Sequence, residues 1–182
     1  MPRNVILIVL CEDPQHQSFC VSLLRKMGFN NHNLDLHVAP KGRGAADGFV
    51  LSEFQRLVKA QRKRSGKAKT GLLTMVDADI REVNAVAANF DGKLDSKRGP
   101  KEHIAVFIPK RNIGTWVRCL GERRAVDEAT DYGRWSKDSD CHPAVDHFLE
   151  LARTQASQVP DDCPPSVKRS LEEYPRIARL RE

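Results

Sequence analysis

The run Val-Ile-Leu-Ile-Val-Leu at residues 5–10 constrains the fold more than any other stretch of this sequence. It is short, continuous and rich in β-branched residues, which is typical of a central strand in a parallel sheet covered on both faces. A helix is expected after it, from roughly Gln15 to Lys26, because Asp13 and Pro14 suit a helix N-cap and a first turn. The chain therefore begins with a strand followed by a helix.

The same order recurs along the chain. Further strands are expected at residues 34–38, 71–76 and 104–108, with helices beginning near residues 46, 80 and 113. Successive strand–helix units predict an α/β fold with an open parallel sheet of about four strands, flanked by helices. Beyond residue 120 the apolar pattern weakens into a charged segment and then helices. Residues 1–120 are therefore expected to form the main domain, and residues 121–182 a helical C-terminal extension packed on it.

Composition limits the class of protein. The chain has 182 residues, 40% of them hydrophobic, and no apolar run approaches the ~20 residues of a membrane span. The N-terminus lacks a signal-peptide cleavage pattern, so a cytoplasmic protein is the default expectation. The five cysteines are odd in number and include no Cys-x-x-Cys pair, which argues against a disulfide framework or a zinc ribbon.

Basic residues are in excess and are concentrated in particular segments. The formal charge is +6 and the pI is near 9.2, which favours an anionic partner such as DNA or RNA. Lys41 and Arg43 stand in a glycine-containing loop that opens a helix, so they are candidates for phosphate binding; a flexible connection is the alternative. A run of cations precedes the third strand, with a solvated loop as its alternative: Lys59, Arg62, Lys63, Arg64, Lys67 and Lys69.

Acidic residues follow the first and third strands. Glu12 comes directly after the first, and Asp77 and Asp79 end the stretch Gly-Leu-Leu-Thr-Met-Val-Asp-Ala-Asp. Parallel strands deliver their carboxyl ends to one edge of a sheet, and these two strands commonly lie side by side, so we expect the three carboxylates to cluster. Close like charges need a positive partner, which Mg²⁺ or Mn²⁺ would supply. The alternative for Asp79 is to cap a helix at residues 80–89.

Acids beside cations suit metal-assisted phosphodiester chemistry. A metal ion at Glu12, Asp77 and Asp79 would polarise a phosphate and lower the pKa of a bound water. Lys110 and Arg111, at the end of the fourth strand, would hold the phosphate backbone, with solvated strand-end cations as the alternative.

Two motifs carry a resemblance to a known family. The segment Leu-Cys-Glu-Asp at residues 10–13, with Phe19 in the following helix, and the segment Met-Val-Asp-Ala-Asp at residues 75–79 resemble the Toprim fold. This is the metal-binding α/β domain of topoisomerases, DnaG-type primases and nucleases of the overcoming-lysogenization-defect family. The resemblance covers about residues 4–120. It implies that Glu12 does acid/base or metal work, and that Asp77 and Asp79 are Mg²⁺ ligands.

The length of the chain resembles that of small stand-alone Toprim-like proteins of bacterial anti-phage systems, some of which act with an ATPase of the ABC type. The resemblance thus implies a Mg²⁺-dependent nuclease that acts in defence on DNA or RNA, with an ABC-type ATPase as partner. Two positions depart from the family pattern. Asp13 stands where a glycine is usual, and Gly114 stands where we expect glutamate, in Asn-Ile-Gly-Thr-Trp at residues 112–116.

Two alternatives remain open. Gly114 favours a catalytically degenerate Toprim-like module that binds nucleic acid or an ATPase partner without cleaving. A receiver-like phosphoacceptor domain also places acids after its first and third strands and a lysine after a later one, roles that Glu12, Asp13, Asp77 and Lys110 could fill. The second acid, Asp79, and the basic run before the third strand argue against the receiver alternative.

Overall fold

A four-stranded, all-parallel sheet forms the centre of the protein. The computed structural model describes residues 5–40, 46–64, 69–154 and 159–181. The strands are β1 (Ile6–Cys11), β2 (Leu34–Val38), β3 (Thr70–Met75) and β4 (Ile104–Phe107), and their order across the sheet is β2-β1-β3-β4. This confirms the predicted α/β class and open parallel sheet. The order also puts β1 and β3 side by side, paired from Ile6 with Thr70 to Cys11 with Met75.

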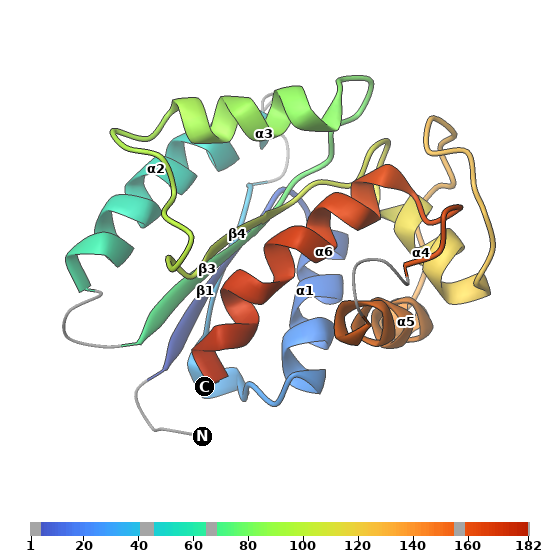
Figure 1. Ribbon diagram of the computed structural model, residues 1–182, viewed down its shortest axis with the longest axis horizontal. Coiled ribbons are helices and arrows are strands. Elements are labelled where there is room, and N and C mark those ends of the chain that lie inside the picture. Colours follow the sequence, from blue (N-terminus) through green and yellow to red (C-terminus); the bar gives the residue numbers. More distant parts are fainter. Residues whose placement is uncertain (1–4, 41–45, 65–68, 155–158, 182) are drawn as a thin grey trace.

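Helices cover both faces of the sheet (Figure 1). On one face lie α2 (Ala46–Arg64) and α3 (Val83–Gly92), which pack on Ile8 and Leu10 of β1. On the other lie α1 (Pro14–Lys26), α4 (Ile113–Glu122), α5 (His142–Arg153) and α6 (Pro165–Ala178). Short 3-10 helices complete the chain: η1 (Asn31–Asn33), η2 (Asp138–Cys141) and η4 (Arg179–Arg181). Among the described residues, none of these helices is both long and apolar enough to cross a membrane.

The C-terminal helices share a core with the sheet. Phe148 of α5 lies edge-on to Phe19 of α1 and stacks on Trp116 of α4, with ring centroids 6.2 and 5.9 Å apart. It also contacts Phe107 of β4 at 5.6 Å. Aromatic rings of this size bury a large apolar area, so α5 contributes to the same hydrophobic cluster as β1 and β3.

Helix α1 begins as its sequence predicts. The Asp13 carboxylate accepts hydrogen bonds from the backbone N–H groups of Gln15 and His16, at 2.8 and 2.9 Å, and Pro14 occupies the first turn. These bonds satisfy donors that a helix start leaves without partners. The cap fixes the first turn of α1 directly after Glu12.

The start of α3 differs from the prediction of a helix at residues 80–89 capped by Asp79. The helix begins at Val83 with Glu82 at the N-cap, and Asp79 has a φ of +54°, in the left-handed region. A turn precedes the helix, in which the Arg81 N–H donates to the Ala78 carbonyl while the Ala78 N–H donates to the Pro109 carbonyl. Because the backbone at Asp79 is left-handed, Asp77 and Asp79 do not lie together on one continuous extended strand.

Candidate metal centre

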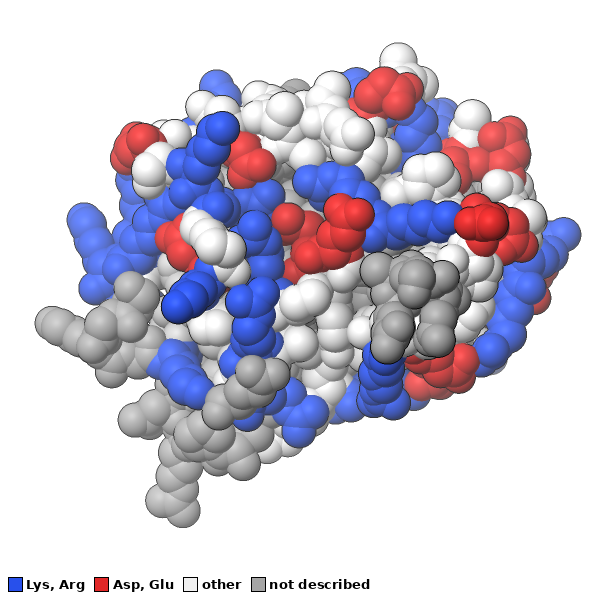
Figure 2. Space-filling view, in the orientation of Figure 1, with Lys and Arg blue, Asp and Glu red and all other residues white. Residues whose placement is uncertain are grey.

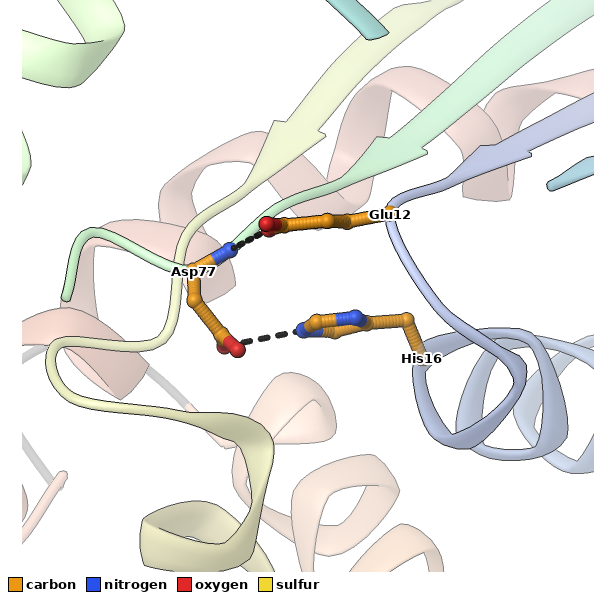
Figure 3. A group of neighbouring side chains, drawn as sticks. All are labelled: Glu12, His16 and Asp77. Carbon is orange, nitrogen blue, oxygen red and sulfur yellow. Dashed lines mark hydrogen bonds and ion pairs between the residues drawn. The ribbon is translucent and has the colours of Figure 1, made fainter. Parts of the chain in front are cut away.

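Glu12 and Asp77 meet at the carboxyl edge of the sheet. The Asp77 N–H donates to Oε2 of Glu12 at 3.0 Å, and so joins the ends of β1 and β3 (Figure 3). This contact follows from the register, because Glu12 and Asp77 come one and two residues after the paired Cys11 and Met75. The predicted neighbourhood of these two acids is therefore present in the structure.

His16 completes the group, and the sequence analysis missed it. Its ring is fully buried and its Nε2 lies 2.8 Å from Oδ1 of Asp77. One ligand atom from each of Glu12, His16 and Asp77 lies within 4.8 Å of the other two, so these residues form a possible metal-binding group near the sheet. Figure 3 shows the three side chains pointing toward one another. The signal in the sequence was a histidine three residues after the helix cap, in the first turn that follows Glu12.

The His16 imidazole lies between two carboxylates. Its Nδ1 is 3.1 Å from Oδ1 of Asp13, without hydrogen-bonding geometry, and its Nε2 bonds Asp77. Burial alone would lower the pKa of His16, but the charge and hydrogen bond of Asp77, together with the close carboxylate of Asp13, outweigh it and raise that pKa well above its ordinary value. The raised pKa favours the protonated imidazole, in which Nε2 donates to Asp77.

Two of the surrounding acids are shifted in opposite directions. Burial raises the pKa of Asp77, and the charge and hydrogen bond of His16 offset this only in part. Burial also acts on Asp13, but the hydrogen bond and charge of His16 outweigh it and hold the pKa of Asp13 well below its usual range. Of these two acids, Asp77 is the one whose negative charge is less compensated by the groups around it.

An open cavity of about 370 Å³ borders Glu12 and Asp77 of this group. It is lined from several parts of the chain, by Glu12, Asp13, Gln15, Asp77, Asp79, Arg111, Asn112, Ile113, Asp131, Gly133 and Arg134. Asp79 lines this cavity with an exposed side chain, but it does not belong to the group of three whose atoms lie within 4.8 Å. A shared ion could reach Asp79 through water, as Mg²⁺ sites often do.

The predicted phosphate-binding cations fall in different places. Arg111 lines the cavity, whereas the Lys110 ammonium bonds Oε1 of Glu82 at 2.7 Å and the Arg81 carbonyl at 2.9 Å, at the start of α3. Lys41 and Arg43 lie outside the described residues. Figure 2 shows one face of the molecule, on which basic side chains crowd the left of the view with a few acidic side chains among them. The excess positive charge is thus not gathered into an uninterrupted patch on that face.

The segment after α4 forms one wall of the cavity. Asn112 donates to Oδ1 of Asp131 at 2.6 Å, Gln15 donates to the Trp135 carbonyl at 2.9 Å, and Arg134 lies 3.3 Å from Oδ2 of Asp13. Arg134 adds a second guanidinium to the rim beside Arg111. The sequence analysis treated this segment only as part of the extension, because its contacts join residues about 120 positions apart.

The same segment explains Gly114. A Cβ placed on Gly114 would lie 2.2 Å from the Gly133 carbonyl oxygen, which is backbone and cannot move independently of its loop. The space that a glutamate side chain would need at position 114 is therefore filled by the chain itself.

Fold and site together define a class: a small α/β protein with a four-stranded parallel sheet and a possible acidic and histidine metal-binding group at the carboxyl ends of two adjacent strands. No protein-family model matches the chain, and neither the curated proteins nor the solved structures give a match. The particular family is therefore not identified, and the Toprim resemblance stays a prediction.

Proposed function

We propose that this protein is a Mg²⁺- or Mn²⁺-dependent nuclease of the Toprim type, in which Glu12 and Asp77 hold the ion. The observation that carries the proposal is the contact of these two acids across the ends of β1 and β3, in a cavity that also holds Asp79, Arg111 and Arg134. Carboxylate oxygens are the ligands that Mg²⁺ prefers. A guanidinium group binds phosphate through two parallel N–H···O hydrogen bonds.

The residues present fit such an ion. The Asp77 charge is largely removed from water and only partly offset by His16, so a divalent cation would supply the missing compensation. Because His16 is held as a donor to Asp77, we assign it the positioning of that carboxylate, with the carboxylate oxygens left for the metal. When bound, the ion would polarise a phosphodiester and lower the pKa of an attached water.

The remaining residues would bind and orient the substrate. Arg111 and Arg134 line the cavity that holds the acids, so a phosphate entering it would meet both guanidinium groups. Asp79 would contact the ion through water. Lys110 would have to leave its ion pair with Glu82 to reach the substrate. The DNA or RNA substrate, the role in anti-phage defence and the ABC-type ATPase partner remain predictions of the resemblance.

The second candidate is a Toprim-like module that binds without cleaving. It is favoured by Gly114, because the Gly133 carbonyl occupies the space where the resemblance leads us to expect an acid. The receiver-like alternative finds less support, because the lysine it needs near Asp77 is bound to Glu82. Phosphorylation of Asp77 by a small phosphodonor would revive that alternative.

A cleavage assay separates these candidates. Supercoiled DNA, single-stranded DNA and RNA are incubated with the protein and Mg²⁺, Mn²⁺ or a chelator, with and without a candidate ATPase. We expect metal-dependent cleavage that Asp77→Asn and Glu12→Gln lower by at least 100-fold, about 2.7 kcal/mol of transition-state stabilisation. The matched control is Asp146→Asn, an exposed acid that pairs with Lys26 away from the cavity. Cleavage that survives Asp77→Asn would exclude this site, whereas Mn²⁺ binding without any cleavage would favour the binding module.

A further inference from the structure

The edge strand β2 has a side-chain pattern that is complementary to the same strand running in the opposite direction. The strand reads Leu-Asp-Leu-His-Val from residue 34 to residue 38, with Leu36 at its centre. Positions equally far from Leu36 match each other: 34 and 38 are both apolar, and 35 and 37 are an acid and a histidine. The strand order leaves β2 at one edge of the sheet, bonded to β1 on its inner side. An edge strand offers unpaired backbone groups as a template for another strand, and proteins usually protect such edges.

The backbone directions show which groups point outward. The Ala39 N–H donates to the Cys11 carbonyl of β1, so residues 37 and 35, two and four positions earlier, also point inward. Leu36 and Val38 therefore direct their N–H and carbonyl groups away from the sheet. Among the residues that the structure describes, these outward groups of Leu36 and Val38 have no hydrogen-bond partner. The Leu36 residue is also 45% exposed, an unusual amount for a large apolar residue in a strand.

We infer that β2 pairs with β2 of a second copy of this chain, antiparallel about a twofold axis at Leu36. In this register Leu36 faces Leu36 of the partner, and the two residues exchange both backbone hydrogen bonds. Asp35 then faces the partner's His37, and Leu34 faces the partner's Val38. Two open four-stranded sheets become one continuous eight-stranded sheet.

Charge complementarity selects a second copy as the occupant. Asp35 is 55% exposed at its side chain. Within the described part of the chain the buried Nε2 of His37 has no hydrogen-bond partner, although it lies 3.2 Å from Oδ1 of its own Asp35, and Nδ1 of the same ring lies 3.6 Å from Oε1 of Glu53. In the antiparallel pair Asp35 and the partner's His37 occupy a non-hydrogen-bonded position, where side chains approach most closely. The twofold axis creates this acid–histidine pair twice. A partner strand of different sequence would need the same alternation to match it.

The surface beside Leu36 is shaped for the same contact. Leu36 projects on the α1 face of the sheet, as does Val9, its partner in the register. There it borders an open hollow lined by α1 residues that include Val21 and Arg25. The partner's Leu36 arrives on this same face and would cover part of the hollow. The inference does not depend on the proposed function.

The test measures the oligomeric state of the full chain. Sedimentation equilibrium and light scattering over a wide concentration range should show a dimer. His37→Glu should weaken it by about tenfold or more, since the change places two acid–acid pairs across the axis, and Asp35→Lys should weaken it because it removes the acid that faces the partner's His37. The double variant Asp35→His with His37→Asp keeps the complementarity and should restore most of the affinity. Arg118→Glu, an exposed change on α4, should not alter it.

A cross-link fixes the register. Asp35→Cys and His37→Cys are prepared as separate variants, mixed and mildly oxidised. Positions 35 and 37 of the two copies should lie about 4.5 Å apart between Cα atoms, within disulfide range, so a cross-linked dimer should form in the mixture and not in either variant alone. Circular dichroism checks that each variant is folded. A chain that stays monomeric at all concentrations, or a dimer indifferent to both charge changes, would overturn the inference.

Discussion

Two clusters of buried charge in this protein are built in opposite ways. At the β4 edge, Arg98 is only 5% exposed and bonds Asp91 at 2.6 Å, Glu173, and the Ile104 carbonyl at 3.1 Å. Glu173 also accepts the Val106 N–H at 3.0 Å and lies 3.4 Å from Arg176. Each acid in this cluster has a guanidinium beside it, and the bonds to β4 cover the backbone of an edge strand.

The candidate metal centre has more acid than cation. Glu12, Asp13 and Asp77 surround the single imidazole of His16, and Asp79 faces the same cavity. The cluster at β4 serves the fold, because its charges are neutralised within the chain. At the candidate centre the acids outnumber the cations beside them, as the proposed metal site requires.

The largest expected effect tests the neutralised cluster. Arg98→Met leaves the Glu173 carboxylate, 12% exposed, with less compensation, and should lower the free energy of unfolding by about 3–5 kcal/mol. Urea denaturation measures this loss. The matched control is Arg118→Met, which removes an exposed pair with Glu122 and should cost less than about 0.5 kcal/mol. Equal losses in both variants would mean that the β4 cluster is no more than surface charge.

The next effect tests the candidate metal centre, where the acids outnumber the cations. Mn²⁺ at about 100 times its dissociation constant should raise the free energy of unfolding by about 2.7 kcal/mol, because it binds the folded chain alone. Asp77→Asn should remove this increment, while Asp91→Asn, in the β4 cluster, should retain it. Thermal unfolding with increasing Mn²⁺ gives both values. An increment that persists in Asp77→Asn would locate the ion elsewhere.

A smaller effect concerns the segment after α4, which forms a wall of the candidate metal centre and has no counterpart at the β4 cluster. Gly114→Ala should lose about 1–3 kcal/mol of stability, because its Cβ would meet the Gly133 carbonyl at 2.2 Å. Gly121→Ala is the matched substitution in the same helix; its Cβ would be 3.9 Å from the nearest atom, and it should gain up to about 1 kcal/mol from helix propensity. Chemical denaturation of the pair measures the difference. A neutral Gly114→Ala would show that the loop yields easily.

The smallest effect is a pH dependence of the free energy of unfolding. It arises from Glu102, an acid that is paired with Arg62 and lies nearer to solvent than Glu173. The Arg62 hydrogen bond holds the pKa of Glu102 below its ordinary value of 4.5. A lowered pKa in the folded state contributes stability above the unfolded value, and this contribution is lost as the pH falls through the folded value. Glu102→Gln should therefore cost under about 1 kcal/mol at neutral pH and nothing in strong acid. Unfolding curves between these conditions test it; a cost that grows in acid would contradict it.

Much of the fold could be predicted from the sequence. The short apolar runs predicted all four strands to within one residue of their observed limits. Their parallel order followed from the strand–helix alternation. The meeting of Glu12 with Asp77 could be anticipated for the same reason, since both follow neighbouring strands.

Other parts of the site depend on contacts that no local pattern records. In the sequence, His16 is a polar residue in the first turn of a helix, with nothing that marks it as part of a site. Only the folded structure shows that Asp13 and Asp77 lie beside its ring. The left-handed backbone at Asp79 results from the turn tied to Pro109, on another strand end. Arg134 and Gly133 reach the site through a long segment without regular periodicity, where sequence patterns predict little.

The bond between the Asp77 amide and the Glu12 carboxylate gives the protein a built-in spectroscopic reporter. Its amide proton is held by a side chain from another strand end, so any movement of that carboxylate changes the magnetic surroundings of one backbone nitrogen. In a spectrum of the uniformly nitrogen-15-enriched protein, the Asp77 resonance would follow events at Glu12 directly, with no chemical probe attached to either side chain.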